Sequence, residues 1–122
     1  MNRVVHFEIS ADEPERAADF YTKVFGWEIK KWDGGFDYWM VMTGDEKEPG
    51  IDGAIMKRSL PKGSSTVNTV TIEDAEQIKE KIIQAGGKQV TDFEIIPKVG
   101  KFAYFEDTEG NLFGILQWKG YM

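Results

Sequence analysis

Hydrophobic and polar positions alternate along the chain, first with the period of a strand and then with that of a helix. From Val4 to Ser10 every second side chain is apolar, which predicts a strand with one buried face. Residues 13–25 then carry apolar side chains three and four positions apart, which is typical of an amphipathic helix. Asp12 and Glu15 favour a helix start there, and Gly26 favours its end.

The rest of the first half predicts strands over 27–32, 36–43 and 51–57, with a glycine-rich turn at 33–35 and a polar loop at 44–50. The composition of residues 61–65 is that of a linker. The pattern then repeats: a strand over 66–72, a helix over 74–86 and three strands over 88–96, 102–106 and 112–118.

This repeat, with a period of roughly sixty residues, indicates two related modules. We predict an α+β fold in which residues 1–122 form one domain, with one βαβββ module at 1–60, a second at 66–122 and the linker between them. The modules are expected to build a curved, mainly antiparallel sheet around a cleft, with the helices outside. A ferredoxin-type sheet is disfavoured because residues 27–57 show no helical stripe.

Composition excludes several classes of protein. The net charge is −6, so we expect neither nucleic acid nor an anionic membrane surface as a partner. Without cysteine there are no disulfides, thiol nucleophiles or zinc ribbons, and with His6 as the only histidine a site with several histidines is impossible within one chain. The N-terminal residues lack the apolar stretch of a signal peptide, and we expect a cytoplasmic protein.

Three segments carry a resemblance to a known superfamily. The first is Phe20-Tyr21-x-x-Val24-Phe25-Gly26-Trp27, preceded by the strand around His6; the second runs from Thr71 to Gly87. The third, Phe102 to Phe113, is similar to an F-x-D-P-x-G-N-x-F hairpin, with Thr108 where proline is usual. Together they resemble the vicinal oxygen chelate superfamily, which includes glyoxalase I, fosfomycin and bleomycin resistance proteins and extradiol dioxygenases. The resemblance covers nearly the whole chain.

Catalytic members of that superfamily hold one divalent metal, with two ligands from each module, and the resemblance implies where the ligands would fall. His6 falls on the first position, whereas Val67 and Gly114 fall on two others and offer no donor. The fourth falls on Gly53, or on Asp52 if the alignment shifts by one residue. We therefore expect no cofactor; the alternative is one divalent metal ion held by His6.

A cleft without metal ligands predicts an apolar pocket for a small organic molecule. His6 and Glu8 share one face of their strand, and His6, with an ordinary pKa near 6.5, is expected to act as a hydrogen-bonding anchor rather than a catalytic base. Catalytic residues are left unassigned, and Asp107 with its acidic neighbours is interpreted as structural. The candidate ligand-binding residues are His6, Glu8, Tyr38, Trp39, Val67, Tyr104 and Gly114.

Three functions remain open at this point. The first is a metal-free, glyoxalase-like binding protein that sequesters its ligand as the bleomycin resistance branch does. The second is a metal-dependent lyase, isomerase, dioxygenase or thiol transferase that uses His6. A third is an accessory domain that acts through a dimer surface. We expect a homodimer in each case, because short modules leave strand edges and apolar surface to cover.

Overall fold

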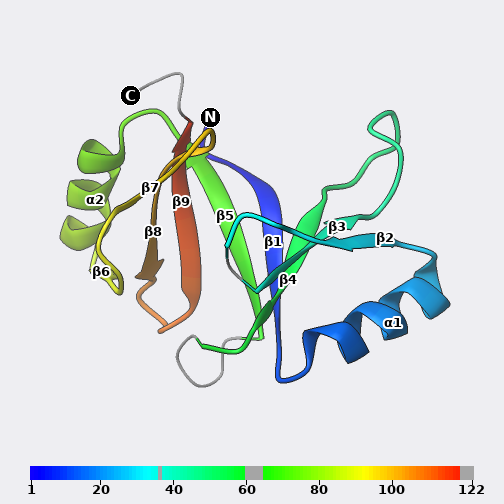
Figure 1. Cartoon of the computed structure of the whole chain (residues 1–122). Coiled ribbons are helices and arrows are strands. Elements are labelled where there is room, and N and C mark those ends of the chain that lie inside the picture. The colour runs from blue at the N-terminus through cyan, green and yellow to red at the C-terminus, as the bar shows by residue number, and fades with distance from the viewer. Residues whose placement is uncertain (36, 60–64, 119–122) are drawn as a thin grey trace. The chain divides into compact units, whose positions relative to one another are not determined.

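The computed structural model of the chain describes residues 1–35, 37–59 and 65–118 (Figure 1). The chain divides into two compact units, here called the N-terminal unit (residues 6–66) and the C-terminal unit (residues 1–5 with 67–122). The described residues form nine strands and two helices. In chain order these are β1 (Arg3–Ala11), α1 (Pro14–Phe25), β2 (Glu28–Lys31), β3 (Tyr38–Met42), β4 (Gly53–Lys57), β5 (Thr66–Ile72), α2 (Ala75–Gln84), β6 (Lys88–Gln89), β7 (Glu94–Ile96), β8 (Gly100–Glu106) and β9 (Leu112–Trp118).

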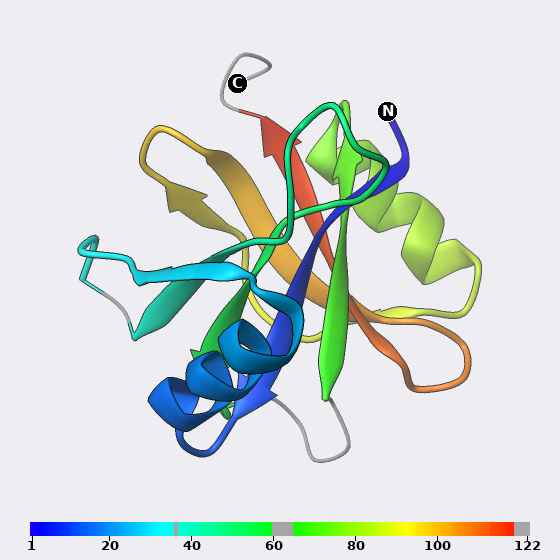
Figure 2. The ribbon, with the colours of Figure 1, turned by 90° about the vertical axis from the view of Figure 1, so that its right-hand side faces the viewer.

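In the N-terminal unit the strands lie in the order β2-β3-β4-β1. The first three form an antiparallel meander, and β1 pairs parallel with β4, so that Glu8 lies opposite Ala54. Figure 2 shows α1, in blue, lying across one face of these strands. The core under the helix consists of Ala11, Val41 and Ile55, surrounded by partly buried Phe7, Ile9, Ala17, Ala18, Tyr21, Trp27, Ile29 and Trp39.

The ends of α1 have different causes. Pro14 occupies the first turn, where its missing N–H costs nothing, and Glu13 is the N-cap without a side-chain hydrogen bond. The expected start signal at Asp12 was wrong, because that carboxylate pairs with Arg58 at 3.0 Å. The expected end at Gly26 is confirmed: this residue takes the left-handed conformation (φ 73°), and its N–H bonds to the carbonyl of Thr22.

Tyr21 and Trp27 of the aromatic motif at the end of α1 pack against the core of this unit. The rings of Tyr21 and Trp27 stack with centroids 5.0 Å apart and planes 8° apart. Phe25 stacks on Trp27 from one side at 5.4 Å, and Phe7 of β1 approaches it at 6.2 Å. The motif therefore fixes the helix against β1 through aromatic packing.

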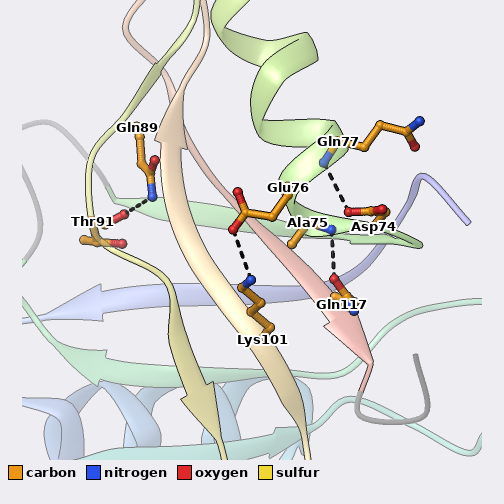
Figure 3. A network of polar contacts seen from close by, with 8 residues as sticks. All are labelled: Asp74, Ala75, Glu76, Gln77, Gln89, Thr91, Lys101 and Gln117. Carbon is orange, nitrogen blue, oxygen red and sulfur yellow. Dashed lines mark hydrogen bonds and ion pairs between the residues drawn. The ribbon is translucent and has the colours of Figure 1, made fainter. Parts of the chain in front are cut away.

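In the C-terminal unit the order is β5-β9-β8-β6, and β7 also pairs with β8. β5 and β9 are parallel, and the other pairs are antiparallel. The core under α2 is formed by Ile72, Ala75, Ala103, Phe105 and Ile115. Figure 3 shows how α2 is tied down at its start: Asp74 accepts the N–H of Gln77, Gln117 of β9 accepts the N–H of Ala75, and Lys101 pairs with Glu76 at 3.1 Å.

The structure corrects one predicted strand. Residues 88–96 form two short strands, β6 and β7, rather than one. Between them Thr91 takes over ladder hydrogen bonds with its side chain, because its hydroxyl accepts the N–H of Tyr104 at 2.9 Å. The Gln89 amide donates to the Thr91 carbonyl at 2.8 Å (Figure 3), and the backbone N–H groups of Val90 and Thr91 both donate to the Tyr104 carbonyl, so the regular pairing is interrupted here.

The predicted α+β class is confirmed: the strands form a mixed, mainly antiparallel arrangement that carries two helices. Of the predicted linker 61–65, residues 61–64 lie outside the described residues, as does Phe36 at the start of the strand predicted over 36–43. Within the part of the chain that the structure describes, neither helix is long and apolar enough to span a membrane.

Candidate functional site

Strand alternation divides the side chains of β1 between two faces. Phe7 and Ile9 belong to the core under α1, so His6, Glu8 and Ser10 point to the opposite face, as the sequence predicts. On β3 the same alternation puts Trp39 and Val41 with the helix and Tyr38 on the face of His6.

A chain of hydrogen bonds joins three of the predicted site residues on this face. The ring nitrogen Nε2 of His6 lies 2.8 Å from the phenol oxygen of Tyr38, and the same phenol donates to Oε2 of Glu8 at 3.0 Å. The Glu8 side chain is 6% exposed, so this carboxylate is held away from water. β4 lies between β1 and β3, and the small, fully buried Ala54 opposite Glu8 leaves room for the phenol to reach across.

Burial and nearby carboxylates set the protonation of this group. Burial lowers the pKa of His6 below 6.5, and the Asp52 carboxylate opposes this in part. Burial, together with the charge and hydrogen bond of Glu8, raises the pKa of Tyr38 far above 10.0. At neutral pH the group therefore consists of an uncharged imidazole and a protonated phenol.

The lowered pKa of His6 makes stability depend on pH. In the unfolded chain His6 takes up a proton near pH 6.5, whereas in the folded chain it resists protonation. The stability that the neutral imidazole contributes is therefore present above that pH and is lost as the pH falls through the folded pKa. We expect the urea midpoint to fall between about pH 7.5 and about pH 5.5. The fall should be smaller in His6→Gln, which lacks the imidazole. An equal fall in both proteins would contradict the assignment.

The structure decides between the two candidates for the fourth ligand position. A side chain on Gly53 would meet the ring of Phe7 at 2.7 Å and its backbone oxygen, so this position faces the helix side and the expectation at Gly53 was wrong. Asp52 is the residue whose charge reaches His6. Its carboxylate accepts hydrogen bonds from the Thr43 backbone at 2.8 Å and from the Thr43 hydroxyl at 3.3 Å.

Trp39 does not share a face with Tyr38, although both are candidate ligand-binding residues. Its indole packs with the core under α1, and Nζ of Lys31 lies 5.2 Å from the ring centroid. The sequence does not determine whether the odd-numbered or the even-numbered residues of the strand predicted over 36–43 face the helix.

The remaining predicted residues lie in the C-terminal unit, on the strand face opposite α2. Val70 and Ile72 pack with the α2 core, so Val67 and Thr69 point the other way. Gly114 lies opposite Thr69 on β5 and opposite Tyr104 on β8. The space above Gly114 is filled by the ring of Phe102, which a side chain there would meet at 2.6 Å.

Two further residues lie on this face: Phe102, which sequence reasoning missed, and Thr69, which it placed on this face but left out of the candidate ligand-binding residues. The ring of Phe102 meets that of Tyr104 edge to face, with centroids 4.7 Å apart. The Thr69 hydroxyl is buried and has no hydrogen-bond partner among the described residues. Both lie two positions from a predicted residue on the same strand, and that spacing could have added them to the candidates.

The acidic hairpin between β8 and β9 has the structural role that the sequence predicts. Asp107 accepts the backbone N–H groups of Asn111 at 2.9 Å and Glu109 at 2.8 Å. These bonds, that of Asn111 first, lower the pKa of the Asp107 carboxyl. The carboxylate thus organises the turn.

The metal-capable side chains of His6 and Glu8 are engaged in hydrogen bonds with Tyr38. His6 Nε2 and Glu8 Oε2 both hydrogen-bond to the Tyr38 oxygen, at 2.8 and 3.0 Å. A zinc ion would need each of these atoms as a ligand at about 2 Å, in place of the hydrogen bond. Val67 and Gly114 have no donor side chain. Among the described residues, no three His, Cys, Asp or Glu side chains form a group that could hold a metal ion.

Comparison with known proteins identifies the family. Residues 3–115 match the profile described as glyoxalase/bleomycin resistance protein/dioxygenase superfamily. A glyoxylase-like domain-containing protein of Didymella fabae is 31% identical over 113 residues, which is 88% of each chain. The chain belongs to the glyoxalase/bleomycin resistance protein/dioxygenase superfamily, as its motifs suggested.

Other relatives share less with this chain. CFP32 of Mycobacterium bovis, whose name classes it with glyoxylases, is 27% identical over 90% of this chain, which spans 42% of that protein. A solved superfamily member from Vibrio splendidus has a TM-score of 0.65 at 18% identity, covering 94% of this chain and 97% of the other. A Streptomyces coelicolor methylmalonyl-CoA epimerase has a TM-score of 0.70 at 14% identity, covering 99% and 97%. These structures share the fold.

Proposed function

We propose that this protein binds a small organic molecule without a metal, and that His6 is the polar anchor of the site. The observation that carries the proposal is the His6–Tyr38–Glu8 chain of hydrogen bonds on the sheet face opposite α1. Burying a carboxylate and an imidazole costs free energy of hydration. Hydrogen bonds within the group or to a ligand must offset that cost. Here the ordered group leaves one nitrogen of the imidazole for recognition.

The surroundings of this group favour a molecule with an apolar part. By strand alternation Met40, Ala54 and Met56 lie on the same face as Tyr38 and Glu8. Methionine side chains are flexible and polarisable and adapt to irregular or flat ligands. On the C-terminal unit, Val67 and Gly114 are buried, and the Phe102 ring covers Gly114. Tyr104 is partly exposed on the same face, and we propose it for ligand contact there.

Native mass spectrometry and elemental analysis of the purified full chain test this function. We expect a small organic molecule bound to the wild type and its loss in His6→Ala, with Glu80→Ala, on the exposed side of α2, as the control. About one Zn²⁺, Ni²⁺, Mn²⁺ or Fe²⁺ per chain that disappears in His6→Ala would overturn the proposal. The alternative function, a metal-dependent enzyme of this superfamily, would then take its place.

We further propose that two copies of the chain associate. Phe20, Val24 and Phe25 of α1 are each more than half exposed, which is a large apolar surface for a monomer. β2 is an edge strand of its unit, paired on one side with β3. The same mass spectra report the mass of the assembly. A cytoplasmic location stays a prediction.

A further inference from the structure

We infer that Tyr38 is a positioning residue that holds His6 in one tautomer, with its hydrogen on Nε2, and thereby selects ligands that donate a hydrogen bond to Nδ1. The inference rests on the proposed function for the ligand but not for the tautomer. Tyr38 would then be more than a ligand contact, because it decides which ring nitrogen of His6 is an acceptor.

The Tyr38 phenol has a single proton to donate. The Tyr38 hydroxyl donates to Oε2 of Glu8 at 3.0 Å, so towards His6 its oxygen is an acceptor. His6 Nε2, 2.8 Å away, must therefore carry the hydrogen. In a neutral imidazole the other nitrogen, Nδ1, then carries the lone pair.

The direction of this chain depends on the charge of Glu8. An ionised Glu8 is acceptor-only and draws the phenol proton towards itself. A protonated Glu8 would donate to Tyr38 instead, and the chain would run the other way.

The same geometry opposes the binding of a cation between His6 and Glu8. The phenol oxygen lies between His6 Nε2 and Glu8 Oε2, in the place that a cation bound to both atoms would need. A cation could reach Nε2 only after its bond to Tyr38 is broken. The two atoms are thus linked through the Tyr38 hydroxyl rather than through a metal ion.

The selected ligand class follows from the free acceptor. Within the described residues the His6 ring makes no hydrogen bond other than that to Tyr38. Nδ1 can accept from a hydroxyl or an N–H group, but it cannot donate to a carbonyl or an ether. We therefore assign to the site a neutral molecule with an O–H or N–H donor beside an apolar part.

The tautomer can be measured directly because the chain has a single histidine. Long-range ¹H–¹⁵N spectra of the ¹⁵N-labelled full chain above the His6 pKa should show Nε2 protonated and Nδ1 unprotonated. In Tyr38→Phe the ratio of the two tautomers should fall by about tenfold, the equivalent of one hydrogen bond. Tyr21→Phe removes a phenol from the α1 aromatic stack and should leave the ratio unchanged.

Two results would overturn the role of Tyr38: a wild type with its hydrogen on Nδ1, or an equal tautomer ratio in wild type and Tyr38→Phe. A dispersed amide spectrum confirms that each variant has folded. Because neither measurement needs a ligand, this part is decided whatever the protein binds.

A matched pair of probes tests the ligand class. Phenol and methoxybenzene share an apolar ring, but phenol alone has a donor. We expect phenol to shift the Nδ1 resonance and to bind at least about fivefold more tightly than methoxybenzene, a difference that His6→Phe should abolish. Equal binding of both probes would overturn the assigned class. If neither binds at millimolar concentration, the proposed function fails while the tautomer result stands.

Discussion

Replacing Phe105 with alanine should lower the free energy of unfolding by about 3–5 kcal/mol. The ring is 0% exposed and lies at the centre of the core under α2. Its neighbours are the rings of Phe93 and Phe113, at 6.1 and 6.2 Å. Alanine would leave a cavity among rigid strands, and β8 and β9, which are joined over seven residue pairs, cannot close it by moving apart.

The measurement is equilibrium unfolding in urea by circular dichroism and by tryptophan fluorescence. Ile95→Ala is the matched control, because this side chain of β7 is 62% exposed and its truncation should change the free energy by less than about 0.5 kcal/mol. If Phe105→Ala costs no more than Ile95→Ala, the C-terminal core is not packed as described.

Most of the fold could be predicted because its strands have one buried face. On β1 and β5 the apolar residues alternate without interruption, so the period of two identifies both the strand and its helix-facing side. Gly26 ends α1 because its backbone is left-handed, a preference that the residue type itself carries. The break between β6 and β7 escaped prediction because it depends on Thr91 meeting Tyr104, which is distant in sequence.

The candidate site could be predicted only in part, for a related reason. His6 and Glu8 fall on one face through local alternation, which the sequence shows. Tyr38 joins them because β3 lies beside β4 and β4 beside β1, and the residues of β3 do not reveal that order. Tyr38 and Trp39 are adjacent aromatic residues, so the pattern alone could not tell which one faces His6.

At position 53 the alignment with the superfamily and the structure disagree. The alignment places a metal ligand at Gly53, so Gly53→Asp is the substitution that would restore a donor there. We expect it instead to lower the free energy of unfolding by about 3–5 kcal/mol, because it would put an unpaired charge against Phe7 on the buried helix side. Urea unfolding measures the loss, and Zn²⁺ titration should show no gain in affinity.

Gly53→Ala separates the effect of the charge from that of crowding. Its methyl group would also meet Phe7, which overpacks the contact and should cost about 1–3 kcal/mol. Gly53→Asp should therefore be less stable than Gly53→Ala, and the gap should narrow at low pH, where the new carboxyl is protonated. If Gly53→Asp were as stable as the wild type and bound Zn²⁺ through His6, position 53 would face His6, and the enzyme alternative would regain its missing ligand.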